Sequence, residues 1–264
     1  MFRNFGRILA ATAMIGLAVA TTACKDGTFT VNGEKGVPLA ELDLSGPAPS
    51  EVAMFGPDDV RLRKGDTLAI TVEGDDKAKD ALRFTLSGGT LGIARTDWSR
   101  DNGRAVITVT MPLPAKLVMA GSGTIASEGL AGDKAEVTVA GSGTVDAGTI
   151  AADSLSVNVA GSGSLKGTGK AKKLNLTVAG SGDAQLDGLS VEEASVDVAG
   201  SGKTAFASDG SVRANIVGSG EVRVKGRATC KVNTVGSGSL VCENGVTPDE
   251  GAEAPPAPPA PASE

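Results

Sequence analysis

Three cysteines, Cys24, Cys230 and Cys242, have the most distinctive chemistry in this chain, and the chain has no histidine. Without histidine there can be no Ser-His-Asp or Cys-His catalysis and no histidine-ligated zinc, iron or copper site. Many enzyme classes are thereby excluded. The sequence predicts no catalytic residue, no cofactor and no metal site.

Cys24 follows a segment with the pattern of an export signal. Arg3 and Arg7 precede an apolar stretch at residues 8–20, and small residues lead up to the cysteine. This order is typical of a secretory signal peptide. The apolar stretch is shorter than the roughly 20 residues that a membrane-spanning helix needs. We predict that residues 1–23 are a signal peptide removed before Cys24.

The residues around the cleavage site resemble a bacterial lipobox, Thr21-Thr22-Ala23-Cys24, with Thr21 where such motifs usually carry leucine. An exported protein with three cysteines has one left over when two pair, and Cys24 is the isolated one. We therefore predict acylation of Cys24, a membrane partner through that lipid, and an outer-membrane lipoprotein of the cell envelope. The alternative is an unlipidated periplasmic protein with a free Cys24.

The tripeptide Gly-Ser-Gly recurs at intervals of 18 to 20 residues. It begins at Gly121, Gly141, Gly161, Gly180, Gly200, Gly218 and Gly236. The residues six, four and two before it are mostly apolar, as in Leu155, Val157 and Val159. This alternation is typical of a strand with one buried face, and a second short strand follows each tripeptide. Residues 118–245 are thus a repeat of strands and tight corners.

Such units are too small to fold singly and must stack. Stacking predicts an all-β fold, a right-handed parallel β-helix whose interior holds ladders of aliphatic side chains. The segment Gly121–Ala126 also fits the dinucleotide-binding pattern Gly-x-Gly-x-x-Gly/Ala. That pattern requires a following helix, whereas strands flank it here, so we interpret the glycines as corners of the coil.

The remaining segments flank this solenoid. Residues 51–117 contain alternating runs and larger side chains, which indicate a β region that caps the first coil. Residues 24–50 are predicted to be a tether or linker, and residues 246–264 a disordered Pro/Ala-rich tail. Trp98 lies in a polar part of the cap region. It is a candidate ligand contact, but a partly packed cap residue is the favoured interpretation.

Cys230 and Cys242 lie six residues before and six after the first glycine of the last tripeptide. Both positions point inward on the two strands of one coil. We predict a Cys230–Cys242 disulfide that closes the final coil, because export favours oxidation. Two buried thiols are the alternative.

The charge pattern argues against nucleic acid as a partner. Residues 24–264 carry 23 basic and 31 acidic residues, a net charge of −8. Residues 183–197 hold five acids and no base, whereas residues 203–231 hold six bases. Opposed bands of this kind favour weak, salt-sensitive self-association.

Ordered motifs outside the tripeptides extend the pattern. They are Phe55-Gly56, Val60-Arg61-Leu62-Arg63-Lys64-Gly65-Asp66, Ile70-Thr71-Val72-Glu73-Gly74, Gly88-Gly89-Thr90-Leu91-Gly92-Ile93 and Val106-Ile107-Thr108-Val109-Thr110-Met111-Pro112. Together with the run into Gly121-Ser122-Gly123, this order resembles the head GIN domain family, also labelled auto-transporter adhesins. The resemblance covers residues 52–245. It implies an exported bacterial β-helical protein and supplies no catalytic residues.

Two functions follow from these features. The first is a non-enzymatic adhesin or structural protein of the cell envelope, whose partner is a glycan or a surface protein. The alternative is a polysaccharide lyase or hydrolase, because right-handed β-helices often carry such sites. Its candidate carboxylates are Asp183, Asp187, Glu192, Glu193 and Asp197, although a solvated acidic band is the favoured interpretation of that cluster.

Overall fold

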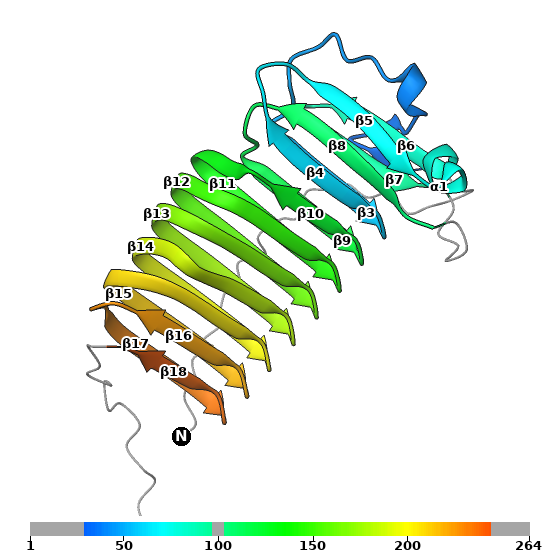
Figure 1. Ribbon diagram of the computed structural model, residues 1–264. Coiled ribbons are helices and arrows are strands. Elements are labelled where there is room, and N and C mark those ends of the chain that lie inside the picture. Colours follow the sequence, from blue (N-terminus) through cyan, green and yellow to red (C-terminus); the bar gives the residue numbers. More distant parts are fainter. Residues whose placement is uncertain (1–28, 97–102, 244–264) are drawn as a thin grey trace, which may run out of the picture.

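The Gly-Ser-Gly units stack in register as a parallel β-solenoid of about six turns (Figure 1). The computed structural model describes residues 29–96 and 103–243. The regular coils consist of long strands that bend around the interior. These are β11 (Gly129–Gly141), β12 (Thr144–Gly161), β13 (Ser164–Gly180), β14 (Asp183–Gly200) and β15 (Lys203–Gly218). The all-β solenoid predicted from the repeat is confirmed.

Equivalent residues of successive coils lie directly above one another. Val157 of β12 pairs with Val137 of β11 and with Leu176 of β13. Ladders of this kind place buried aliphatic side chains on a line along the solenoid, while the residues between them face solvent. The alternating apolar residues therefore form the core, since each strand contributes one buried face to the ladder.

The two glycines of each corner are required for different reasons. Gly161 has φ +107°, and a Cβ atom there would lie 2.6 Å from the carbonyl oxygen of Gly141 in the coil before. At Gly163 a Cβ atom would lie 2.6 Å from Cγ1 of Val139. The first glycine permits the turn and the close approach of two backbones, and the second leaves room for a core side chain.

Residues 51–117, expected to be a β region that caps the first coil, also contain two further layers of parallel strands. Strands β3 (Glu51–Gly56) and β4 (Asp59–Lys64) pair in parallel with β9 (Lys116–Gly121) and β10 (Thr124–Ser127). On their other side, β7 (Thr90–Arg95) and β8 (Ala105–Met111) add one more parallel layer. The chain thus builds the β3–β4 coil first, then the layer outside it, and then crosses back to β9.

A β cap closes the N-terminal end beyond that layer, as the fold class predicted. Strands β5 (Ala69–Gly74) and β6 (Leu82–Ser87) pair antiparallel with β8 and β7. Helix α1 (Asp76–Ala81) lies between them and buries Ala78. The helix begins at Asp75, whose side chain accepts a hydrogen bond from the Lys77 N–H at 2.9 Å, a standard N-cap.

Residues 24–50 were expected to be a tether or linker, and the part that the structure describes, residues 29–50, packs against the cap. They form a small hairpin, β1 (Thr30–Val31) and β2 (Glu34–Lys35), and a 3₁₀ turn at Leu39–Glu41. Val37 exchanges two backbone hydrogen bonds with Phe84 of β6, at 2.9 and 2.8 Å. Val31 is buried, and Phe29 contacts Phe55. Apolar side chains spaced too irregularly to suggest a strand therefore hold this segment against the cap.

The C-terminal end consists of shorter strands. These are β16 (Glu221–Lys225), β17 (Thr229–Gly236) and β18 (Ser239–Cys242), stacked on β15 and on one another. Within residues 29–96 and 103–243, no helix is long and apolar enough to cross a membrane.

The corner constraint is testable with Gly161→Ala. The variant should unfold at lower urea concentration, because alanine at this φ costs about 1–3 kcal/mol before the contact with Gly141 is counted. Ser162→Ala, at the exposed position of the same corner, is the matched control and should be near neutral. Equal stability of the two variants would contradict the role assigned to the glycine.

Candidate functional site

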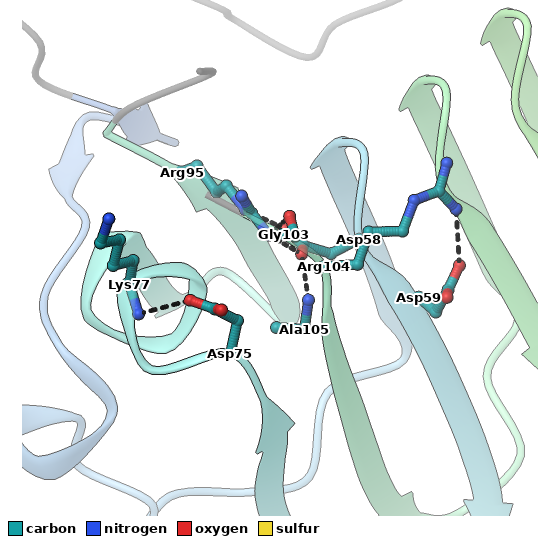
Figure 2. Close-up of polar contacts among 8 residues, drawn as sticks. All are labelled: Asp58, Asp59, Asp75, Lys77, Arg95, Gly103, Arg104 and Ala105. Atoms are coloured by element: carbon teal, nitrogen blue, oxygen red, sulfur yellow. Dashed lines mark hydrogen bonds and ion pairs between the residues drawn. The ribbon is translucent and has the colours of Figure 1, made fainter. Parts of the chain in front are cut away.

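The most unusual polar group in the described structure is a buried ion pair at the corner of the first layers. Asp59 of β4 pairs with Thr124, so Asp58 takes the place that Gly123 occupies one coil later. The Asp58 side chain is almost completely buried and meets Arg95 at the end of β7 (Figure 2). Arg95 Nε donates to Asp58 Oδ2 at 2.6 Å, and Arg95 Nη2 donates to Asp58 Oδ1.

Two backbone groups complete this corner. The Ala105 N–H donates to Asp58 Oδ1 at 2.8 Å, and Arg95 Nη2 also donates to the Gly103 carbonyl at 3.1 Å. The carboxylate therefore joins three segments: the β3–β4 corner, the end of β7 and the start of β8. A buried ion pair recovers its desolvation cost only when geometry and hydrogen bonding are good. The two-pronged Arg–Asp contact supplies the geometry, and Arg95 Nη1 is left without a hydrogen-bond partner among the described residues.

The same close-up contains polar contacts of a different kind. Asp59 lies 3.6 Å from Arg104 at the surface, where both side chains are partly exposed (Figure 2). Such a pair contributes little, because water screens it. Because the Asp58 and Arg95 side chains are almost completely buried, they have no access to a substrate in solution. We assign the pair a structural role, that of holding the outer layer in register.

The five candidate carboxylates do not converge on one site. They follow β14 around the coil, and four of them bind different neighbours. Asp183 accepts from the Lys203 N–H at 3.1 Å, Asp187 lies 2.9 Å from Lys225 Nζ, Glu193 lies 3.3 Å from Lys173 Nζ, and Asp197 accepts from Asn215 at 2.7 Å. The acidic band interpreted as solvated is thus paired with the coils on either side. Of the five, Asp183, Glu192 and Glu193 line three different grooves of the described structure.

A shallow groove of about 700 Å³ crosses four coils, β11 to β14, where the strands bend. Its lining includes Asp133, Asp153, Lys170, Lys172 and Glu192, with alanine and valine backbone between them. Lys172 Nζ lies 2.7 Å from Asp153 Oδ1. That hydrogen bond, helped by the charges of Asp153 and then Glu192, raises the pKa of Lys172. The groove presents ordered charges on an accessible surface, which suits binding.

The cysteines and Trp98 divide between described and undescribed parts of the chain. Cys230 on β17 and Cys242 on β18 form a disulfide in the structure, with Cα atoms 6.8 Å apart. Cys24, the predicted lipidation site, and Trp98, the candidate ligand contact, lie outside the described residues.

The sequence did not reveal the Asp58–Arg95 pair. Its corner reads Gly56-Pro57-Asp58, which differs from the repeated tripeptide. One signal was available, because Val60 and Leu62 repeat the alternation that follows the later tripeptides, as in Val145 and Ala147. Aligning those residues would have placed Asp58 at a glycine position. Nothing local in the sequence connects it with Arg95, 37 residues away.

The fold places this chain in the class of capped parallel β-solenoid proteins, with coils of 18 to 20 residues. The chain belongs to the family described as "Putative auto-transporter adhesin, head GIN domain", whose model matches residues 48–228. The resemblance stated from the sequence motifs is confirmed. No curated protein sequence matches the chain.

Solved structures share the fold at low sequence identity. A protein of Bacteroides fragilis described as a "putative adhesin" has a TM-score of 0.69 at 20% identity, over 74% of this chain and 93% of its own. A Parabacteroides distasonis protein titled "Putative lipid binding protein" has a TM-score of 0.59 at 24% identity, over 75% and 93%. Another from the same species, titled "putative adhesin", has a TM-score of 0.61 at 21% identity, over 75% and 94%. At these identities the likeness concerns the fold.

The buried pair predicts a large difference between two neighbouring aspartates. Asp58→Ala should lower the free energy of unfolding by about 3–5 kcal/mol, because it leaves the Arg95 charge buried without its partner. Asp59→Ala, which removes only the surface contact with Arg104, should lower it by less than about 1 kcal/mol. Urea denaturation of both variants measures the difference, and equal losses would contradict the structural role.

The disulfide is tested by counting thiols in the unfolded protein. In a Cys24→Ser background, the oxidised chain should show no free thiol and the reduced chain two. Replacing both Cys230 and Cys242 with alanine should cost about 2–3 kcal/mol, mainly through loop-closure entropy. Two titratable thiols in protein isolated from the cell envelope would refute the pairing.

Proposed function

We propose that this protein is an exported, lipid-anchored adhesin of the cell envelope that binds without catalysis. The observation that supports this most directly is the groove across four coils, which displays charged side chains in register on a rigid scaffold. The family description as an adhesin agrees with this use. An extended, repetitive surface suits an extended partner, either a glycan or another envelope protein.

The location of the first described residues indicates which end of the solenoid an anchor at Cys24 would hold. Phe29 packs against Phe55 at the capped end of the solenoid. Phe29 is the fifth residue after Cys24, and five residue steps span at most about 17 Å. A lipid on Cys24 would hold the capped end close to the membrane, and the last coil would be the part farthest from it.

The charges of the outer surface limit the choice of partner. Residues 24–264 carry a net charge of −8, which disfavours nucleic acid. In the groove, Lys172 is already bound to Asp153, whereas Lys170 forms no ion pair with any described residue. A partner with hydroxyl groups and an occasional acidic group, such as an acidic glycan, matches this arrangement.

Labelling with a fatty acid and protease treatment of intact cells test the proposal together. Wild-type protein should carry the label, Cys24→Ser should not, and the matched variant Cys230→Ser/Cys242→Ser should keep it. The solenoid should be cleaved or released from intact cells if the protein is displayed as an adhesin. Unlabelled wild-type protein would refute the anchor. Protection until the outer membrane is opened would refute surface display and favour a periplasmic role.

A further inference from the structure

The last coil leaves a sheet edge open at the end opposite the cap (Figure 1). Strand β17 pairs with β15, and β18 pairs with β16. In the part of the chain that the structure describes, no strand pairs with the other side of β17 or β18. An edge of this kind presents a row of backbone donors and acceptors to which another strand can add.

This edge lacks the usual protection against pairing. Between Thr229 and Cys242 only Lys231 is charged, and there is no proline. Two large apolar side chains are exposed there, Val235 at 70% and Val241 at 44%. Natural edge strands are usually blunted by lysines, prolines or bulges. The composition of the last coil thus favours contact with a further strand.

A ladder of side-chain amides ends on the same strand. Asn215 donates to Asp197 at 2.7 Å, and Asn233 of β17 donates to Asn215 at 3.0 Å. In each step, the side-chain oxygen of one coil accepts a hydrogen bond from the side-chain amide of the next coil. Asn233 is the last rung, and its Oδ1 is the corresponding acceptor for a strand added to β17.

The sequence that follows the last coil is unsuited to cover this edge. Residues 244–264 contain six prolines, and no proline-free run among them exceeds six residues. Strand β17 alone is eight residues long. Because proline has no N–H to donate to a ladder, this segment cannot supply a complete strand. These residues are therefore a poor match for the full length of the edge.

The two ends of the solenoid differ, which determines how two copies can meet. At the capped end, α1 closes the interior and Val37 covers the edge of β6. A stack of the last coil on that end would not continue the parallel ladders. We propose that two copies pair through their last coils, β17 and β18 of one against the same strands of the other. This contact is isologous, so it closes at a dimer.

The dimer would specify how the protein acts as an adhesin, and this step rests on the proposed function. With each anchor at the capped end, a pair joined through the last coils carries its two lipids at opposite ends. Such a pair connects two membranes, which is homophilic adhesion. The pairing itself requires no lipid and can be measured on unacylated protein, so failure of the anchor and failure of the dimer are separate results.

Sedimentation velocity of the full chain carrying Cys24→Ser tests the dimer. We expect a monomer–dimer equilibrium between about 1 and about 100 µM, the range of modest specific interfaces. Val235→Lys/Val241→Lys should weaken it at least tenfold, because like charges are brought together across the contact. Val217→Lys is the matched control. Val217 is 55% exposed and stacks directly on Val235, but it lies one coil away from the edge, so its replacement should leave the equilibrium unchanged.

Four results would overturn the proposal. A wild-type monomer at every concentration excludes the pairing, and oligomers larger than a dimer exclude its closure. Loss of dimer in Val217→Lys as large as in Val235→Lys/Val241→Lys would place the contact on the side of the solenoid. Dimerisation only after removal of residues 248–264 would identify the chain's own C-terminal segment as the occupant. Circular dichroism of each variant establishes that the coils remain folded.

Discussion

Contact between the backbones of successive coils is the constraint on which this structure depends. At every tripeptide corner, the carbonyl oxygen of one coil lies where a Cβ atom of the next would be, as at Gly141 and Gly161. The Ser162 N–H donates to that Gly141 carbonyl at 2.9 Å. A side chain at the corner would separate the coils and break the ladder on both adjoining faces. The glycine content of the chain is therefore a consequence of stacking.

The first layers show what happens where the glycine is absent. Asp58 stands at a glycine position, and its carboxylate needs a partner because it points into the interior. In the outer layer, Arg95 and the Ala105 N–H donate hydrogen bonds to this carboxylate. At this corner the outer layer, β7 and β8, follows β3 and β4 in the chain. The charge pair of Asp58 and Arg95 joins the two layers there. It fixes β7 and β8 on β3 and β4, although the chain folds back across them to reach β9.

The regular part of the fold could be predicted from the sequence because its signals are local. Leu155, Val157 and Val159 alternate with polar residues, and the tripeptide repeats at nearly constant intervals. The layers around Glu51 were beyond that reasoning. Strands β3 and β9 meet across about sixty residues and have only the pairs Met54/Met119 and Gly56/Gly121 in common. The packing of Val31 and Val37 was missed for a similar reason. Isolated apolar residues show no period, and only the cap explains the burial of Val31 and the bridge from Val37 to Phe84.

The acidic and basic side chains on the outer surface pair with each other. This pairing explains why the clustering of acids in the sequence did not locate a functional site. The acids of β14 and the bases of the following coils form two bands in the sequence, which suggested either carboxylate chemistry or attraction between molecules. In three dimensions adjacent coils lie one strand spacing apart, about 4.8 Å, so each band first meets the other within the same molecule. Asp187 reaches Lys225 two coils away, and Asp197 reaches Asn215 in the next. Lateral attraction between molecules is weakened by these contacts. Among the described residues, the outer side of the nearly uncharged last coil pairs with no strand. The end of such a solenoid is therefore a better place for specific association than its charged sides, because an edge offers directional hydrogen bonds that no neighbouring coil satisfies.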